Sequence, residues 1–309
     1  MNDLKILITA AYNTGHFSPF VVEQAKSLQK LGVEIEFFGI EGKGLLGYLK
    51  NRKQLIRKIK EFQPDIIHAH YGLSGLLANL QRKVPVVTTF HGSDIHSGGV
   101  ILFLSRMAMH LSKYNIFVSN GLYKIAKYKK KNYIVTACGT DVAKVFPVDR
   151  QQARAALNWS DDKKYILFSG AFTNPIKNAL LAQEAVKLVE NATLIELKGY
   201  TREEVNLLLN ACDVQLTTSI RESGPLIVKE AMACGCPVVS VDVGDVKEII
   251  GDMQGYYIAD RTPESIAKKL QQVLVLNMRT TGRERILELG LDAETVAKRI
   301  LKIYERVAK

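Results

Sequence analysis

The chain has 309 residues, 47% of them hydrophobic, so it is long enough for two domains and apolar enough to give each a core. Its formal net charge is +11. Residues 1–150 carry all of that charge, because they hold 21 basic and 10 acidic side chains while residues 151–309 balance. This asymmetry favours an anionic partner for the first half, either nucleic acid or a lipid surface. No nucleic-acid recognition motif accompanies the charge, so we expect no nucleic-acid partner.

The sequence contains no hydrophobic run long enough to span a bilayer. Its first residues lead straight into a predicted strand, without the pattern of a secretory signal. The cysteines, Cys138, Cys212, Cys234 and Cys236, lack the C-x-x-C spacing of zinc sites and sit in or beside apolar runs. We therefore expect buried free thiols in a reducing compartment, which predicts a cytoplasmic protein.

Strand and helix patterns alternate through the first half of the chain, which predicts an α/β domain with a mainly parallel sheet. The predicted strands cover residues 4–10, 33–38, 65–69, 84–90, 115–118 and 133–136. The predicted helices cover residues 18–31, 45–62, 101–111 and 121–129.

Residues 145–150 are typical of a linker, and the alternating pattern restarts after them. Predicted strands cover residues 165–169, 193–197, 213–218 and 238–241. Predicted helices cover 179–189, 203–211, 263–276, 279–289 and 293–307, with one more starting near Pro225. We expect an N-terminal domain over residues 1–147 and a C-terminal domain over residues 148–292.

The segment Ser223-Gly224-Pro225 predicts a helix start, with a capping Ser or Gly and Pro at the first helical position. Gly235 predicts the end of that helix. The free N–H groups at such a helix start suit a phosphate. Glu222 precedes the start, and Glu230 lies about 7.5 Å along the axis from Pro225 at 1.5 Å per residue. Two carboxylates so placed suit a ligand made of a sugar, a diphosphate and a ribose; two solvated surface glutamates are the alternative.

The stretch from Ser219 to Ser240 resembles the E-x7-E motif of retaining glycosyltransferases of family 4, which have the GT-B fold. The resemblance is dense over residues 165–257. It implies two Rossmann-like domains that face each other across a cleft, with the last helix, about 293–309, crossing back to the first domain. It also implies that Glu222 serves the donor sugar and Glu230 the nucleotide ribose. The backbone of Leu226 and Ile227, just after Gly224, would hold the distal phosphate.

Two loops of the first half resemble further family segments. Gly15 keeps one glycine of a loop that commonly has two, and its backbone would lie near the donor phosphates. His91, followed by Gly92, matches the family's His-Gly segment and would contact the donor sugar near the reaction centre. Asp94 would orient His91 or bind acceptor hydroxyls. The alternative for His91 is a satisfied structural histidine.

Gly170 ends the first strand of the second half. The family has an Arg directly after this glycine and a Lys several residues later, both on the donor diphosphate. Ala171 stands at the position of the Arg, and Lys177 supplies the Lys. Because a diphosphate leaving group needs cationic compensation, we expect Arg221 to replace the missing Arg.

The stretch Gly42-Lys-Gly-Leu-Leu-Gly47 spells the G-x-G-x-x-G pattern of dinucleotide sites. It follows the second predicted strand instead of the first, and Asp65 opens a strand where a ribose-binding acid would end one. We therefore interpret it as a flexible loop beside the active-site cleft.

No metal site is predicted. His68 and His70 share one face of a strand, but no carboxylate or third ligand stands out beside them. The sequence has no D-x-D triplet, Walker A loop or zinc signature. We expect no cofactor, only a nucleoside-diphosphate sugar as co-substrate.

These patterns predict a retaining, metal-independent glycosyltransferase of the hexosyl or N-acetylhexosaminyl class. It would act on a glycan or lipid-linked acceptor in cell-surface polysaccharide synthesis. One alternative is a sugar-nucleotide epimerase of the same fold, which needs no acceptor. Another is a non-catalytic nucleotide-sugar-binding protein, which Ala171 favours.

Basic side chains of the first half cluster around residues 50–60 and 124–131. Apolar side chains lie between them, as on an interfacial helix: Leu55, Ile56 and Ile59 in the first cluster, and Tyr123, Ile125 and Tyr128 in the second. We therefore predict a peripheral protein on an anionic surface, the inner face of the plasma membrane. The alternative is a solvated helix whose apolar stripe packs on its own sheet.

Overall fold

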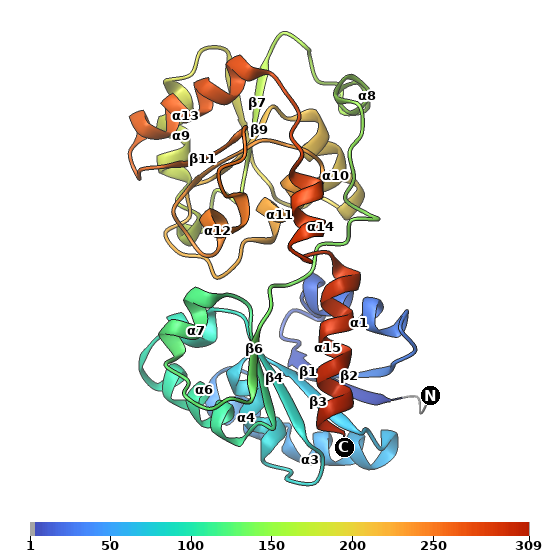
Figure 1. The fold of residues 1–309 in the computed structure, drawn as a ribbon. Helices are drawn as coiled ribbons and strands as arrows, with labels where there is room; N and C mark the ends of the chain where they lie inside the picture. The colour runs from blue at the N-terminus through green and yellow to red at the C-terminus, as the bar shows by residue number, and fades with distance from the viewer. Residues whose placement is uncertain (1–3, 309) are drawn as a thin grey trace. The chain divides into compact units, whose positions relative to one another are not determined.

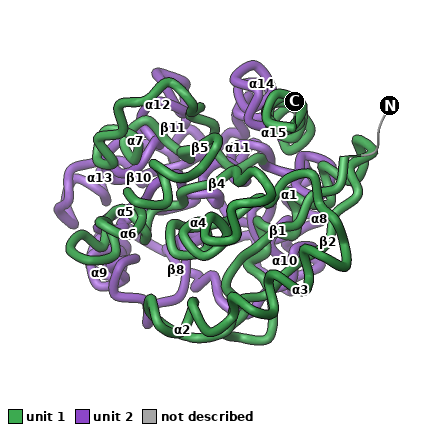
Figure 2. The backbone as a smooth tube through the Cα atoms, turned by 90° about the horizontal axis from the view of Figure 1, so that it is seen from below, with its two compact units in different colours: residues 1–139, 293–309 green, residues 140–292 purple. Residues whose placement is uncertain are grey.

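The computed structural model describes residues 4–308 (Figure 1). The chain forms two compact units, coloured separately in Figure 2. Unit 1 comprises residues 1–139 and 293–309, and unit 2 comprises residues 140–292. Each unit is a parallel sheet with helices, so the predicted α/β class is confirmed for both halves.

Unit 1 contains six parallel strands in the order β2-β1-β3-β4-β5-β6. They are β1 (Lys5–Ala11), β2 (Glu34–Ile40), β3 (Ile66–His70), β4 (Val86–Phe90), β5 (Tyr114–Phe117) and β6 (Tyr133–Val135). The helices are α1 (Pro19–Gln29), α2 (Gly44–Lys50), α3 (Arg52–Phe62), α4 (Gly72–Asn79), α5 (Ser93–His96), α6 (Gly99–Leu111), α7 (Asn120–Ala126) and α15 (Ala293–Val307). Every residue of β3 and β4 is buried, as expected where helices cover both faces of a parallel sheet.

Unit 2 contains five parallel strands in the order β11-β10-β9-β7-β8. They are β7 (Lys164–Phe168), β8 (Ala192–Ile195), β9 (Val214–Thr217), β10 (Val238–Val241) and β11 (Tyr256–Ala259). The helices are α8 (Arg150–Ala156), the 3-10 turn η1 (Pro175–Lys177), α9 (Ala179–Lys187), α10 (Arg202–Ala211), α11 (Leu226–Ala233), α12 (Val246–Ile250), α13 (Pro263–Leu276) and α14 (Gly282–Glu288).

Both sheets contain a point at which the strand order reverses. In unit 1 the chain leaves β1 toward β2 on one side and later adds β3 on the other side of β1. In unit 2 the same reversal occurs at β7, with β8 on one side and β9 on the other. Open α/β sheets bind ligands beyond the carboxyl ends of the strands at such points. The loops after β1 and β3, and those after β7 and β9, are therefore the expected ligand-binding loops of the two units.

The segment predicted as a linker, residues 145–150, belongs to unit 2. Val145 is fully buried in the core of that unit. The backbone N–H of Phe146 donates to Asn206 Oδ1 at 3.0 Å, and that of Val148 donates to Asn210 Oδ1 at 2.8 Å. Because α10 holds this segment, the boundary falls between residues 139 and 140, earlier than the predicted boundary at residue 147.

The predicted helix over residues 45–62 is two helices, α2 and α3, separated at Asn51. The amide of Asn51 donates to the backbone oxygens of Glu41 and Gly47 at 2.8 and 2.9 Å, which fixes the bend. Gly44 and Gly47 thus lie in α2, so the G-x-G-x-x-G stretch is not the loop that we predicted. A Cβ on Gly42 would lie 2.9 Å from Gly47 Cα, so these glycines allow two backbone segments to touch.

The two basic clusters of unit 1 pack most of their apolar side chains inward, although Ile125 of the second cluster is 42% exposed. Leu55 and Phe62 of α3 are buried against the sheet, with Ile59 packed beside them. Tyr128 is buried as well, beside β5 and β6. The alternative that α3 packs its apolar stripe on its own sheet is therefore correct. Within residues 4–308, no helix is both long and apolar enough to cross a membrane.

Helix α4 was not predicted, because its sequence is rich in glycine. Gly72 and Gly75 are both buried in it. A Cβ on Gly72 would lie 2.1 Å from Ser105 Oγ of α6, and one on Gly75 would lie 2.7 Å from Thr88 of β4. The two glycines thus allow α4 to pack closely between α6 and the sheet.

Helix α15 packs along α1 in unit 1 (Figure 1). Its apolar side, from Val296 to Val307, joins the core formed by β1 and α1. Tyr304 is fully buried, and its hydroxyl lies 2.5 Å from Nδ1 of His68. The other ring nitrogen of His68 lies 2.7 Å from Thr89 Oγ1, so both nitrogens of this buried ring have partners.

Tyr304→Phe should lower the free energy of unfolding by about 1–3 kcal/mol, because it leaves a buried nitrogen of His68 unpaired. Chemical denaturation of the purified variant measures this difference. Lys298→Gln removes an exposed pair with Glu294 on the same helix and should change stability by less than about 1 kcal/mol. Equal stability of Tyr304→Phe and the unmodified protein would show that the hydrogen bond contributes nothing.

Candidate active site

The loops after β7 and β9 lie side by side in unit 2. The hydroxyl of Thr218, directly after β9, donates to the backbone oxygens of Lys177 and Asn178 at 3.0 and 2.9 Å. The backbone N–H of Ile220 donates to Ile176 O at 2.8 Å. These bonds hold the two loops together at the point where the strand order reverses.

Lys177 and Glu222 form an ion pair between these loops. Lys177 Nζ lies 2.7 Å from Glu222 Oε1, and Ser219 Oγ donates to the same oxygen at 2.9 Å. A Cβ on Gly170 would lie 3.1 Å from Lys177 Cε, so this glycine leaves room for the lysine to cross the end of β7. The structure thus brings together three of the residues proposed from sequence. Both charged side chains are about one-fifth exposed, so a ligand can reach them.

Helix α11 begins one residue later than predicted, at Leu226. Pro225 has an extended ψ of 115° and is the N-cap, not the first helical residue. The N-cap residue, Pro225, makes no side-chain capping bond to this helix start. The backbone N–H groups of Leu226 and Ile227 lie in the first turn of the helix, which is an arrangement that suits an anion.

A buried ion pair lies directly behind this helix start. Lys229 is fully buried, and its Nζ lies 3.3 Å from Asp245 Oδ2. A Cβ on Gly224 would lie 3.0 Å from Asp245 Oδ2 and 3.1 Å from Lys229 Nζ, so Gly224 allows the loop to rest on the pair. Burial raises the pKa of Asp245, while Lys229 lowers it. Sequence reasoning missed both residues, although a lysine inside an otherwise apolar helix was a usable signal.

Glu230 is also paired in unit 2. Its Oε1 lies 2.6 Å from a guanidinium nitrogen of Arg202, the first residue of α10. The carboxylate of Glu230 is 4% exposed, so it is not the solvated glutamate of the alternative interpretation. Arg202 was not predicted, since nothing in the sequence links α10 with α11. Thr201 and Glu204 cap α10 reciprocally and thereby fix the position of Arg202.

Two arginines lie near the loop after β9: one is exposed, and the other is hydrogen-bonded to the backbone of the loop. Arg221, proposed as the replacement for the arginine missing at Ala171, is exposed beside Glu222. Arg261 was not predicted; its guanidinium donates to the backbone oxygens of Ser219 and Ile220 at 2.7 and 3.2 Å. Arg261 therefore shapes the loop through its backbone.

In unit 1, His91 follows β4 and lies among other rings. Its Nε2 lies 2.9 Å from His70 Nδ1, and its Nδ1 lies 3.8 Å from Cys138 Sγ. The rings of Phe20 and Tyr71 lie 4.7 and 4.8 Å from it, centroid to centroid. Burial lowers the pKa of His91 to about 3, so the ring is neutral at physiological pH.

Asp94 does not orient the ring of His91, because His70 and Cys138 contact the two ring nitrogens. Its carboxylate instead accepts hydrogen bonds from the backbone N–H groups of Gly92, at 2.8 Å, and Gly72, at 3.2 Å. Burial raises its pKa to about 6, although these backbone bonds oppose the shift. Asp94 therefore joins the His-Gly loop to the start of α4.

Gly15 lies in the loop after β1 with φ of +74°, a conformation that glycine adopts readily. Nothing lies within 4 Å of the position of a Cβ on this residue. Asn13 joins the same loop to Gly42, accepting from its N–H at 2.7 Å and donating to its oxygen at 3.2 Å. The loop after β1 is therefore braced, and the N–H of the exposed Gly15 donates to Tyr12 O at 3.1 Å within it.

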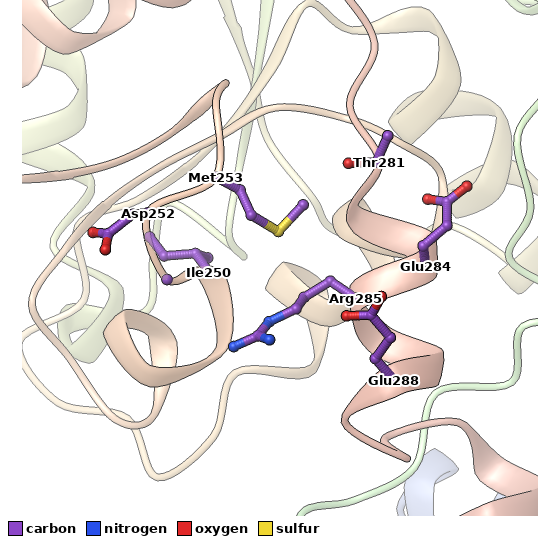
Figure 3. Close-up of a pocket in the computed structure, with 8 residues that line it drawn as sticks. Ile250, Asp252, Met253, Thr281, Glu284, Arg285 and Glu288 are labelled. Carbon is purple, nitrogen blue, oxygen red and sulfur yellow. The ribbon is translucent and has the colours of Figure 1, made fainter.

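A different hollow of about 440 Å³ lies between α12 and α14 of unit 2 (Figure 3). Its lining includes Asp252, Glu284 and Glu288, with Arg285 as its only cationic side chain. The Nε of Arg285 donates to Ile249 O at 3.4 Å. None of the proposed site residues lines this hollow, and its excess of carboxylates disfavours a diphosphate.

Among residues 4–308, no three or more His, Cys, Asp or Glu side chains gather in a group that could hold a metal ion. All four cysteines are free thiols, and all except Cys138 are buried.

Comparison with known proteins agrees with this geometry. Residues 190–286 match the family model "Glycosyl transferases group 1", and residues 17–120 match "Glycosyl transferase 4-like". A curated relative is the N,N'-diacetylbacillosaminyl-diphospho-undecaprenol alpha-1,3-N-acetylgalactosaminyltransferase of Campylobacter jejuni. It is 22% identical over 93% of this chain and 89% of its own.

Two solved structures share the fold over nearly all of the chain. The sucrose-phosphate synthase of Thermosynechococcus elongatus gives a TM-score of 0.84 at 18% identity, covering 98% of each chain. HepE of Anabaena, solved in complex with UDP, gives a TM-score of 0.78 at 15% identity. That match covers 98% of this chain and 100% of HepE.

The fold and the matches to both halves define the class: the protein is a glycosyltransferase, an enzyme that moves a sugar from an activated donor to an acceptor. Within this class, it is a GT-B glycosyltransferase of the family 4 type. The resemblance stated from the E-x7-E stretch is thereby confirmed.

Lys229→Met should lower the free energy of unfolding by about 3–5 kcal/mol, because it leaves Asp245 buried without a counter-charge. The double variant Lys229→Met/Asp245→Asn should recover much of this loss, since it removes both charges. Urea denaturation of the three proteins measures the difference. If the double variant proves as unstable as Lys229→Met alone, the pairing with Asp245 is not what stabilises the buried lysine.

Proposed function

We propose that this protein transfers a hexosyl or N-acetylhexosaminyl group from a nucleoside-diphosphate sugar to a glycan or lipid-linked acceptor. Transfer would proceed with retention of configuration and without a metal ion. The observation that carries the proposal is the Lys177–Glu222 pair, which lies at the strand reversal of unit 2. The complex of HepE with UDP supports a nucleotide donor.

On this proposal, donor binding rearranges the ion pair. The N–H groups of Leu226 and Ile227 receive the distal phosphate, and Lys177 turns from Glu222 to the diphosphate. Glu222 then accepts hydrogen bonds from sugar hydroxyls. Lys177 and the helix start together supply the positive charge that a departing diphosphate needs. Arg221, which is exposed beside Glu222, adds a further cation.

Glu230 would accept hydrogen bonds from the ribose hydroxyls. Its burial and its pair with Arg202 fix the carboxylate in place before the donor arrives. A carboxylate that is already fixed in place loses less conformational entropy when the ribose binds than a mobile carboxylate would. Gly170 and Gly224 would contribute by allowing close approach, and Gly15 would offer its backbone to the donor phosphates.

Retention would follow from attack on the face that the diphosphate leaves. The acceptor oxygen forms a bond to the anomeric carbon while the bond from that carbon to the phosphate oxygen breaks. The departing phosphate oxygen takes the proton of the acceptor hydroxyl. No protein nucleophile is required, and neutral His91 would serve by hydrogen bonding to the sugar, with Asp94 binding acceptor hydroxyls.

The proposed setting is the cytoplasmic face of the plasma membrane, in the synthesis of a cell-surface polysaccharide. The +11 charge of residues 1–150 supports contact with an anionic surface. The name of the Campylobacter relative specifies an acceptor on diphospho-undecaprenol, which supports a lipid-linked acceptor for this chain.

The decisive experiment incubates the purified protein with a panel of nucleotide sugars and acceptors and follows the products by mass spectrometry and NMR. We expect transfer only with an acceptor, an unchanged anomeric configuration, and the same rate in the presence of a chelator. Donor turnover without an acceptor would favour an epimerase. Loss of activity in chelator would assign to a metal the charge compensation that we propose for Lys177.

Two carboxylate variants should separate the roles of Glu222 and Glu230. Glu230→Ala should weaken binding of the nucleoside diphosphate at least ten-fold, because the ribose loses its acceptor. Glu222→Gln should lower kcat more than it changes this affinity, because it would act on the sugar. Calorimetry and initial rates measure both effects. Unchanged nucleotide affinity in Glu230→Ala would remove the ribose assignment.

Acceptor use should depend on the ionisation of Asp94. Its raised pKa, about 6, means that the carboxylate is protonated below that pH and accepts hydroxyl hydrogen bonds above it. His91, with a pKa of about 3, does not titrate there. The kcat/KM for the acceptor should therefore rise through about pH 6. Asp94→Asn should be slower at high pH and lack this rise; a persistent rise would assign the titration to another group.

A further inference from the structure

Helix α6 of unit 1 exposes an apolar stripe made of Val100, Phe103, Met107 and Leu111. These side chains are 71%, 63%, 40% and 47% exposed. Their spacing of three, four and four residues places them on one side of the helix. The remaining exposed positions of α6 are Gly99 and His110, and its one Lys or Arg side chain, the half-buried Arg106, donates to Ala126 O at 3.3 Å.

The inner side of α6 is apolar as well. Leu104 and Ala108 are buried there, in contact with Leu76 of α4. A surface helix normally has one polar side, and a helix that is apolar on both sides is normally covered on both. Within the described residues of unit 1, the outer stripe is therefore an apolar surface that the unit itself leaves uncovered.

The segment that contains this stripe is basic and lacks acidic residues. Residues 95–140 contain seven Lys or Arg and no Asp or Glu. Lys130 Nζ donates to His110 O at 3.3 Å, which places this cation at the end of α6. A hollow of about 510 Å³ beside Leu111 is lined by Arg82, Lys83 and Lys113, together with uncharged residues.

We propose that the α6 stripe docks on an anionic lipid bilayer. The four apolar side chains would enter the headgroup–acyl boundary, and the surrounding Lys and Arg side chains would bind anionic headgroups. Charge complementarity selects this partner, because residues 95–140 and the lining of the hollow beside Leu111 contain cations and no carboxylate. Each of these cations should contribute about five-fold to the affinity for an anionic surface, so the loss of about four of them would remove a large part of the attraction.

Docking through α6 has a consequence for the acceptor. Ser105, on the inner side of α6, donates its hydroxyl to the backbone oxygen of Asp94 at 2.9 Å. Helix α6 therefore supports Asp94 on one side and would face lipid on the other. An acceptor with a lipid anchor would reach Asp94 along the element that touches the bilayer. Only this step depends on the proposed function; the docking itself does not.

Vesicle co-sedimentation of the purified full chain tests the proposal. We expect binding to vesicles that contain phosphatidylglycerol, little binding to phosphatidylcholine alone, and release by salt. Phe103→Ser/Met107→Ser should reduce binding at least ten-fold. Leu180→Ser/Val275→Ser is the matched control, because it removes exposed apolar side chains from unit 2 and should bind normally.

A second pair of variants tests the charge. Lys113→Gln/Lys130→Gln should weaken binding about twenty-five-fold if each cation contributes about five-fold. Lys53→Gln/Arg57→Gln removes the same number of charges from α3 and should have a smaller effect. Transfer to a soluble acceptor should be the same in all four variants, so failure of docking and failure of the proposed transferase activity are distinguishable.

Several outcomes would overturn the proposal. One is equal binding to neutral and anionic vesicles, or none to either at low salt. Another is a larger loss in the α3 variant than in the Lys113/Lys130 variant. A dimer in sedimentation velocity that Phe103→Ser/Met107→Ser abolishes would show that a second copy of the chain covers the stripe.

Discussion

The ion pair between Lys177 and Glu222 is the interaction on which the proposed donor site depends. It exists because β7 and β9 are neighbours although they are not consecutive in the chain. That strand order brings the loops after both strands to one edge of the sheet, and Thr218 fixes them there. The pair balances a cation and a carboxylate that donor binding would separate. A diphosphate with an attached sugar matches both groups at once, which neither a free sugar nor a free phosphate does.

The start of α11 adds a second positive feature beside this pair, and its environment explains why the local sequence is so specific. Gly224 has no side chain because the Lys229–Asp245 pair occupies the space where a Cβ would lie. Lys229 and Asp245 are costly to bury, so each depends on the other. The backbone N–H of Leu226 can therefore face a ligand, while the loop behind it rests on the ion pair of Lys229 and Asp245.

Much of the fold follows from local sequence patterns, because buried parallel strands are short β-branched runs. The meeting of Gly170, Lys177 and Glu222 could be predicted only through the resemblance to a known family. Arg202 could not be assigned, since its ion pair with Glu230 joins two helices that are separate in the sequence. Helix α4 was missed because its glycines, which normally weaken a helix, are required for close packing.

The basic first half of the chain also contains features that the local sequence pattern could not predict. Alternating cations and apolar residues in α3 suggested an interfacial helix, yet a helix that packs on its own sheet has the same pattern. An interfacial helix exposes its apolar side chains and a helix packed on its own sheet buries them, and this difference depends on the tertiary structure. Leu55 is buried, whereas Phe103 of α6, in a segment with the composition of an ordinary core helix, is 63% exposed. In this chain an exposed apolar stripe is thus better evidence of a lipid-facing surface than a basic amphipathic pattern, because solvent alone would not favour the exposure of those side chains.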